Sequence, residues 1–140
     1  MSRIFWDTNL FIYLFEGSGK LFEQVAALRV RMASRSDQLY TSTLTLGEVL
    51  VHPIKVGNAR LHQQYEQELS GGAALIPFDQ NTARIYALIR GDRTLKAPDA
   101  IQLACAAQAR VDLFITNDDR LSAKAIPGIQ FIVALDKAFI

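Results

Sequence analysis

Short apolar runs alternate with longer amphipathic stretches along the chain. The apolar runs predict five strands, at residues 3–6, 38–41, 73–77, 113–116 and 130–133. Between them, apolar residues three and four positions apart predict helices. These helices are expected at residues 10–16, 21–34, 44–51, 59–69, 81–90, 98–110 and 120–124. Such alternation is typical of an α/β fold with a central, mostly parallel five-stranded sheet flanked by helices.

The size of the chain favours one domain over residues 1–140. Half of its 140 residues are hydrophobic, which is enough to bury a substantial core. There is no internal repeat, low-complexity segment or linker long enough to divide it. The stretch "SGG" is expected to end the helix at Leu69, and Pro98 suits the first turn of its helix, where a missing N–H costs nothing.

Charge and cysteine content exclude little. Fifteen basic residues face 14 acidic ones, so only local clustering can indicate a nucleic-acid partner. The single cysteine, Cys105, rules out an internal disulfide and is expected to be a small buried apolar residue. No apolar run approaches the roughly 18 residues of a membrane span, and Asp7 interrupts the N-terminus too early for a signal peptide. We expect a cytoplasmic protein without a membrane contact.

Two predicted strands end in acidic residues. The stretches "IFWDTN" and "LFITNDDR" both pass from apolar residues to a carboxylate, Asp7 in the first and Asp118 in the second. In open α/β sheets, ligands bind beyond the carboxyl ends of the strands. Asp99, in "KAPDAIQLACAAQA", falls in the first turn of a helix and is expected at the same edge of the sheet.

A fourth acid, Glu48, stands alone among apolar residues in "TLTLGEVLV". Each acid also has a plainer interpretation. Asp is favoured at helix N-caps and in first turns, so Asp7, Asp99 and Asp118 are each compatible with capping. Glu48 is compatible with the solvated face of its helix. If it is buried instead, its charge needs a cation or hydrogen bonds.

Taken together, the four acids indicate a metal site. Converging carboxylates repel one another, and a hard divalent cation such as Mg²⁺ or Mn²⁺ supplies the missing positive charge. With such an ion, water can attack a phosphodiester bond. Small polar residues beside the acids are suited to orienting them; these residues are Thr8, Asn9, Thr116 and Asn117.

The acidic segments resemble a known family. "FWDTNLFIYLFE", "TSTLTLGEVL", "LKAPDAIQLACAAQA" and "LFITNDDRL" are similar, in order and spacing, to the four acidic blocks of the PIN-domain nucleases. The resemblance covers essentially the whole chain. It implies a three-layer fold and an Mg²⁺- or Mn²⁺-dependent ribonuclease.

The same resemblance implies roles for individual residues. The catalytic and metal-binding acids would be Asp7, Glu48, Asp99 and Asp118, with Asp7 and Asp99 the main ligands. Asn9 and Thr116 match the family's supporting polar positions. Asp119 falls one residue past the matched acid and is expected to cap the short helix that follows.

Compact bacterial and archaeal chains of this family are most often VapC-like toxins. The resemblance therefore also implies a small antitoxin, which inserts a peptide into the acidic groove, and a homodimer. The segments "TLTLGEVLVHPI" and "ARLHQQYEQEL" predict neighbouring helices whose apolar positions either receive a partner helix or pack into the core.

Basic residues provide candidates for RNA contacts. Arg90, Arg93 and Lys96 precede the Asp99 helix, in a loop expected to open at the acidic edge and hold phosphates. An ordinary solvated surface is the alternative. A second basic group comprises His52, Lys55, Arg60 and His62. The two histidines are ten residues apart without a nearby cysteine, so they do not indicate zinc.

Other functions fit the residues less well. A haloacid-dehalogenase-like phosphatase needs a second Asp two positions after the first, where Asn9 stands. A receiver domain needs paired acids at the first strand and an acceptor on a middle strand, but Asp7 is alone and only Asp79 follows the third strand. Two alternatives stay open: a PIN nuclease that processes RNA without a toxin role, and a non-catalytic module that binds a metal or a partner.

Overall fold

The structure is a computed structural model that describes residues 1–138 and 140. Its strands are β1 (Arg3–Trp6), β2 (Gln38–Ser42), β3 (Ala74–Ile76), β4 (Leu113–Thr116) and β5 (Phe131–Ala134). They form one sheet in the order β3-β2-β1-β4-β5, and every neighbouring pair is parallel. The predicted five-stranded, mostly parallel sheet is confirmed.

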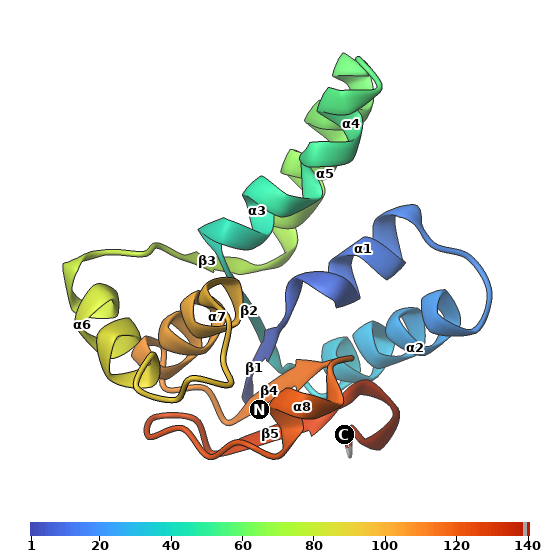
Figure 1. Cartoon of the computed structure of the whole chain (residues 1–140). Coiled ribbons are helices and arrows are strands. Elements are labelled where there is room, and N and C mark those ends of the chain that lie inside the picture. The colour runs from blue at the N-terminus through green and yellow to red at the C-terminus, as the bar shows by residue number, and fades with distance from the viewer. Residues whose placement is uncertain (139) are drawn as a thin grey trace.

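The helices connect and cover these strands. They are α1 (Thr8–Glu16), α2 (Lys20–Ser34), α3 (Thr43–Val49), α4 (Val51–Lys55), α5 (Ala59–Gly72), α6 (Gln80–Ile89), α7 (Ala97–Gln108) and α8 (Asp119–Ser122), followed by the 3₁₀ turn η1 (Leu135–Lys137). Figure 1 shows α1 and α2 on one side of the sheet, and α6 and α7 on the other. Helices on both faces make the three-layer arrangement that was expected.

The alternation of residues along β1 explains the layers. Ile4 and Trp6 point into the core formed with α1 and α2, whereas Phe5 points into the core formed with α7. Phe5 stacks on Phe114 of β4 with ring centroids 5.1 Å apart. All four side chains are fully buried. A strand that is apolar on both faces belongs in the centre of a parallel sheet, and β1 lies there.

Helices α3, α4 and α5 form an arm that rises from the sheet (Figure 1). The predicted helix over residues 44–51 instead ends at Val49, and α4 starts at Val51. Pro53 explains the break, because proline has no N–H for the Val49 carbonyl and its ring crowds that carbonyl. On α4, Val51 and Ile54 are 55% and 60% exposed.

Smaller differences concern the ends of elements. Helix α5 continues through "SGG" to Gly72 instead of ending at Leu69, and β5 begins and ends one residue later than predicted. The turn η1 was not predicted. Cys105 is buried, as expected, and burial raises the pKa of its thiol to about 12. Within residues 1–138 and 140, no helix combines the length and apolar character needed to cross a membrane.

Candidate active site

Asp7 lies at the carboxyl end of β1, beside the end of β4. The register pairs Trp6 with Ile115, and the Asp7 backbone N–H donates to the Ile115 carbonyl at 3.0 Å. Thr116 Oγ1 therefore reaches Asp7 and donates to its Oδ2 at 2.7 Å. Asp7 also caps α1, because Oδ1 accepts the Thr8 backbone N–H at 2.9 Å. Capping is thus one role of Asp7, and it leaves the carboxylate at the sheet edge.

The electrostatic environment of Asp7 is unfavourable to its charge. The residue is 8% exposed, and burial is the main cause that raises its pKa to about 6. Hydrogen bonds from Thr116 and Thr8 lower the pKa, but by less than burial raises it. The carboxylates of Asp99 and Glu48 raise it further. A nearby cation would reverse this penalty.

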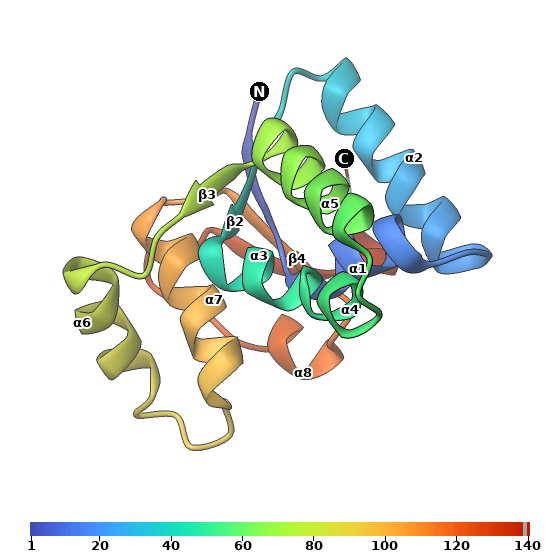
Figure 2. The same cartoon turned by 90° about the horizontal axis from the view of Figure 1, so that it is seen from above.

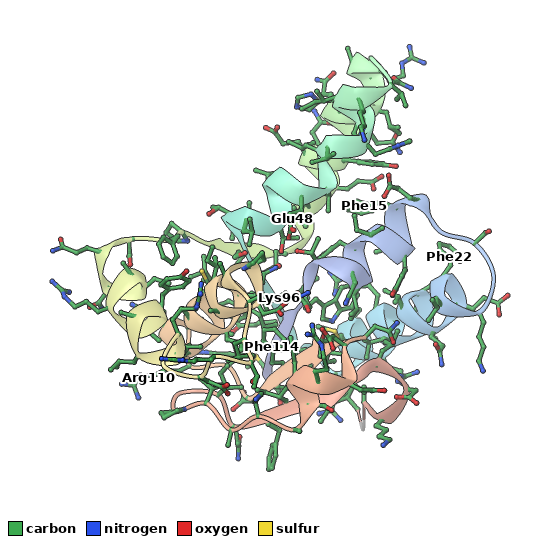
Figure 3. All side chains as sticks on the ribbon, in the orientation of Figure 1. Phe15, Phe22, Glu48, Lys96, Arg110 and Phe114 are labelled. Carbon is green, nitrogen blue, oxygen red and sulfur yellow. The ribbon has the colours of Figure 1, made fainter. Side chains whose placement is uncertain are left out.

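Glu48 reaches the same place from α3. This helix starts directly after β2, where Ser42 Oγ accepts the Thr45 backbone N–H at 3.3 Å and caps the first turn. Thr8 Oγ1 donates to Glu48 Oε1 at 2.7 Å. Glu48 is half-buried and lines a cleft together with Asp7, so a solvated helix face does not describe it. Figure 3 labels Glu48 beneath α3.

Asp99 lies in the first turn of α7, on the opposite side of the cleft. Lys96 occupies the N-cap position, Pro98 lies in the first turn, and no side chain caps the helix. Capping therefore does not explain Asp99. Partial burial and then the Asp118 carboxylate raise its pKa, whereas Arg120 and Lys96 lower it.

Asp118 is paired with Arg120, a residue that the sequence pattern did not single out. Arg120 Nε and Nη2 donate to the two Asp118 oxygens at 3.0 and 2.6 Å, and Nη2 lies 3.7 Å from Asp99 Oδ2. This pairing holds the pKa of Asp118 below its usual range. Asp118 is also the N-cap of α8, with Oδ1 accepting the Arg120 backbone N–H at 3.1 Å. The expectation that Asp119 caps this helix is wrong: Asp119 is its exposed first residue.

A buried glutamine, which the sequence pattern also did not single out, lies behind the acids. Gln102 is 2% exposed, and its Nε2 donates to Thr8 Oγ1 at 2.7 Å and Thr45 Oγ1 at 2.8 Å. Its Oε1 accepts the Ser42 hydroxyl. The signal was available: a polar residue stands three positions after Asp99 in an otherwise apolar stretch.

Asn9 and Thr116 support the site in different ways. Thr116 contacts Asp7 directly. Asn9 Oδ1 accepts the Asn117 backbone N–H at 3.4 Å, and Asn117 Nδ2 donates to Tyr13 Oη at 2.9 Å. The two asparagines thus connect α1 to the loop after β4 and help to hold the two acidic strand ends together.

The acids line one cleft of about 470 Å³. Asp7, Glu48, Asp99 and Asp118 all contribute to its wall. Its helical lining residues come from α1, α3, α4 and α7, and Figure 2 shows these helices from above. A larger groove of about 820 Å³ runs between α6, α7 and residues 123–128, but its carboxylate, Asp92, is bonded to Lys124 at 2.8 Å. The four candidate acids therefore gather in the smaller cleft.

A comparison with protein families accounts for these features. The family model described as PIN domain matches residues 4–127, which is most of the chain. The chain belongs to the PIN domain family. Members of this family are generally nucleases, as the sequence resemblance implied. Among curated proteins, none matches the chain.

Solved structures show the same fold. A chain of a toxin-antitoxin complex from Klebsiella pneumoniae is 28% identical, with a TM-score of 0.65 over 90% of this chain and 94% of that one. A chain of VapBC2 from Rickettsia felis, bound to a promoter DNA fragment, is 14% identical, with a TM-score of 0.75 over 94% and 98%. A chain of VapBC-5 from Mycobacterium tuberculosis is 18% identical, with a TM-score of 0.61 over 96% and 99%.

The oxygen ligands in the acidic cleft are of the kind that bind a hard cation. All four acids offer oxygen, the ligand that Mg²⁺ and Mn²⁺ prefer. Within residues 1–138 and 140, no three acidic, histidine or cysteine side chains are close enough to form a ready-made metal shell. Mg²⁺ usually keeps several waters and takes only one or two carboxylates from the protein, so a full shell is not required. The raised pKa of Asp7, which a cation would lower, agrees with such a site.

The predicted RNA-contacting residues of the PIN cleft are separated by the fold. Lys96 lies beside the acids, where its charge lowers the pKa values of Asp99 and Asp118. Figure 3 labels Lys96 near the start of α7. Arg90 instead lies over the Tyr86 ring, 5.8 Å from its centroid, and donates to Tyr86 Oη at 2.9 Å. Arg93 is exposed in the loop between α6 and α7.

Proposed function

We propose that this PIN domain is an Mg²⁺- or Mn²⁺-dependent endoribonuclease that hydrolyses RNA phosphodiester bonds in the acidic cleft. One observation carries the proposal: Asp7, Glu48, Asp99 and Asp118 line one cleft, in which burial raises the pKa of Asp7. A metal ion would supply the positive charge that this buried, acidic cleft lacks. Asp7 and Asp99 are its main ligands, and Glu48 and Asp118 complete the pocket.

The residues around Asp7 orient the proposed ligands. Thr116 Oγ1 holds Asp7 Oδ2, and the Thr8 backbone N–H holds Oδ1, so the carboxylate plane is fixed. Glu48 Oε1 accepts the Thr8 hydroxyl, which leaves Oε2 to bind the ion or its water. When bound, the ion supplies positive charge that activates water and stabilises charge on a phosphoryl oxygen. On the exposed side of the cleft, Arg120 and Lys96 offset the charge of an incoming phosphate.

Cleavage of structured RNA by the purified protein tests this function. We expect cutting with Mg²⁺ or Mn²⁺ and none with EDTA. Asp7→Asn and Asp99→Asn should each abolish it. Asp119→Asn is the matched control, because Asp119 is an exposed acid next to the site and should leave cleavage unchanged. If all variants cut like the unchanged chain, the cleft is not the nuclease site.

We also propose that the chain is the toxin of a VapBC-like pair, acting as a single cytoplasmic domain over residues 1–140. The similarity to a chain of the Klebsiella pneumoniae toxin-antitoxin complex supports this role. The arm offers apolar surface for partners: Val51, Ile54 and Val56 are 55–60% exposed. Buried Val49, Tyr65 and Leu69 show that other apolar positions of the arm serve the core. A small antitoxin and a second copy of the chain are the proposed partners.

Growth and size measurements separate the toxin role from RNA processing. Induced expression in a bacterial host should arrest growth, and Asp7→Asn should restore it. Metal-dependent cleavage in vitro without growth arrest favours the RNA-processing alternative. Light scattering of the purified protein should give the mass of a dimer, and Ile54→Glu should shift it towards the monomer if the arm is the interface.

A further inference from the structure

We propose that Gln102 is a positioning residue for the metal site: its amide keeps the Thr8 hydroxyl directed at Glu48 and thereby fixes this carboxylate towards the ion. The inference rests on the proposed metal-dependent function. It adds a residue from the middle of α7 whose hydrogen bonds go to Thr8, Thr45 and Ser42 and not directly to the acids. Hydrogen bonds connect Gln102 to Glu48 through Thr8.

The path runs from the buried Gln102 amide through the half-buried Thr8 hydroxyl to Glu48. Gln102 Nε2 donates to Thr8 Oγ1 at 2.7 Å, and Thr8 Oγ1 donates to Glu48 Oε1 at 2.7 Å. Thr45 Oγ1 lies 2.8 Å from the same Nε2 and 3.1 Å from Thr8 Oγ1. Gln102 is 2% exposed, and Thr45 and Ser42 are fully buried. Water therefore has little access to Gln102, Thr45 and Ser42, whereas Thr8 lies at the wall of the cleft.

The chemistry of the groups sets the direction of each proton. An ionised carboxylate only accepts, so the single Thr8 proton must point to Glu48. Thr8 Oγ1 can then only accept from its other neighbours, and Gln102 Nε2 is a donor at 2.7 Å. The Ser42 hydroxyl satisfies the other end of the amide by donating to Oε1. The arrangement leaves no polar atom of the Gln102 side chain without a partner.

The reversed amide would break this path. With Oε1 facing Thr8, the Thr8 hydroxyl would have to donate to Gln102, and its only proton would leave Glu48. In the observed orientation, the Ser42 hydroxyl donates to Oε1 and both Nε2 protons go to the two threonines. A glutamine at this position thus does what an apolar residue of the same size cannot: it donates to Thr8 and Thr45 at once.

Four variants test the role, and Mn²⁺ affinity measured by calorimetry is the main readout. Gln102→Met keeps the volume and removes both donors, and Thr8→Val removes the hydroxyl between Gln102 and Glu48. Each should weaken Mn²⁺ binding by about 10-fold, as is typical when the partner of a metal ligand is lost. Thr8→Ser keeps the hydroxyl and should retain the affinity. Gln102→Met combined with Thr8→Val should bind no more weakly than Thr8→Val alone, because both act through one path.

A purely structural role gives different results. Thr82→Val is the control: Thr82 is also fully buried and hydrogen-bonded, but to Asp79 near the start of α6. It should lower the melting temperature and leave Mn²⁺ affinity unchanged. If Gln102→Met likewise changes only the melting temperature, or if its effect adds fully to that of Thr8→Val, the positioning role is wrong.

Further outcomes keep the two proposals distinguishable. If Gln102→Met does not fold, the isosteric Gln102→Glu carries the same expectation, since its carboxyl cannot donate to both threonines. Failure of both variants to fold assigns Gln102 to stability and overturns the inference. If the unchanged chain binds no Mn²⁺ and cuts no RNA, the proposed function itself fails. Normal binding and cleavage by the unchanged chain and by Gln102→Met overturn only the role of Gln102.

Discussion

The acidic cleft has two sides that handle negative charge in opposite ways. On the inner side, Asp7 and Glu48 receive hydrogen bonds from neutral hydroxyl and backbone groups, and burial raises the pKa of Asp7 to about 6. On the outer side, Arg120 pairs with Asp118 and lies 3.7 Å from Asp99. The pKa of Asp118 is lowered.

This difference indicates which carboxylates would bind a metal ion most favourably. Neutral donors orient a carboxylate without balancing its charge. The negative charge on the inner side is therefore not neutralised. Arg120 already supplies part of that charge on the outer side. We therefore expect metal binding to depend most on Asp7 and Asp99 and least on Asp118. The following variants test this contrast, beginning with the largest expected effect.

Asp7→Asn should make the metal-free protein more stable while it removes activity. The pKa of Asp7 is raised from 3.8 to about 6, so the protonated form favours folding. The contribution of protonated Asp7 to the free energy of unfolding is fully present below about pH 4 and is lost as the pH rises through about 6. Two pKa units correspond to about 3 kcal/mol. Denaturant unfolding with EDTA should show the variant more stable at pH 8 by up to that amount.

The pH dependence provides the control for this effect. At pH 4, where Asp7 is largely protonated, Asp7→Asn and the unchanged chain should unfold at similar denaturant concentrations. Asp119→Asn should match the unchanged chain at both pH values, because Asp119 is exposed. If Asp7→Asn is less stable than the unchanged chain at pH 8, the charge of Asp7 does not destabilise the folded protein.

Asp99→Asn and Asp118→Asn should weaken metal binding to different extents. Asp99 lies 3.7 Å from Arg120 on the outer side, but its charge also acts on Asp7, whereas both Asp118 oxygens already accept from Arg120. We expect Mn²⁺ affinity to fall at least about 10-fold for Asp99→Asn, within the range seen for changes around metal sites. The fall for Asp118→Asn should be only a few-fold. Calorimetric titration distinguishes them, and an equal loss would remove the contrast between the two sides.

Arg120→Gln should strengthen metal binding slightly. Its removal frees Asp118 and takes a positive charge away from the cleft. The Arg120 side chain is 57% exposed, so solvent screens the pair and the gain in affinity should be only about a few-fold. Mn²⁺ titrations at low and high ionic strength should show the gain shrink with added salt. Weaker Mn²⁺ binding by Arg120→Gln would mean that Arg120 supports the metal site.

The smallest effect is expected from Lys96→Gln. Lys96 lies near the outer acids, so its loss should raise the KM for RNA modestly and leave kcat unchanged. The salt dependence of RNA binding should also decrease by about one phosphate contact. Arg90→Gln is the comparison, because Arg90 donates to the Tyr86 hydroxyl and lies over its ring. A larger loss for Arg90→Gln would place the RNA path along α6 instead.

Much of the fold was predictable because its pattern is local. Strands β1 and β4 are short and apolar on both faces, and their ends are marked by Asp7 and Asn117. Pro53, which explains the helical break at Leu50, was also visible in the sequence, but the apolar pattern of α3 runs across the break. Apolar periodicity reports which face is buried and not whether the backbone is continuous.

The acids of the site were predictable because each stands at a recognisable position relative to an element. Arg120 and Gln102 were not found, because the contacts that define their roles form only in the folded chain. Gln102 is 94 residues from Thr8, which it contacts. Arg120 is close to Asp118 in sequence, but only the turn at the start of α8 brings its guanidinium back onto the carboxylate.

The central claim is tested most directly by the effect of Mn²⁺ on the melting temperature at pH 8. This shift is measured for the unchanged chain and for Asp7→Asn. We predict that Mn²⁺ raises the melting temperature of the unchanged chain and leaves that of Asp7→Asn unchanged, because the ion neutralises a buried carboxylate that the variant lacks. Equal shifts for the two proteins would contradict this prediction and remove Asp7 from the metal site.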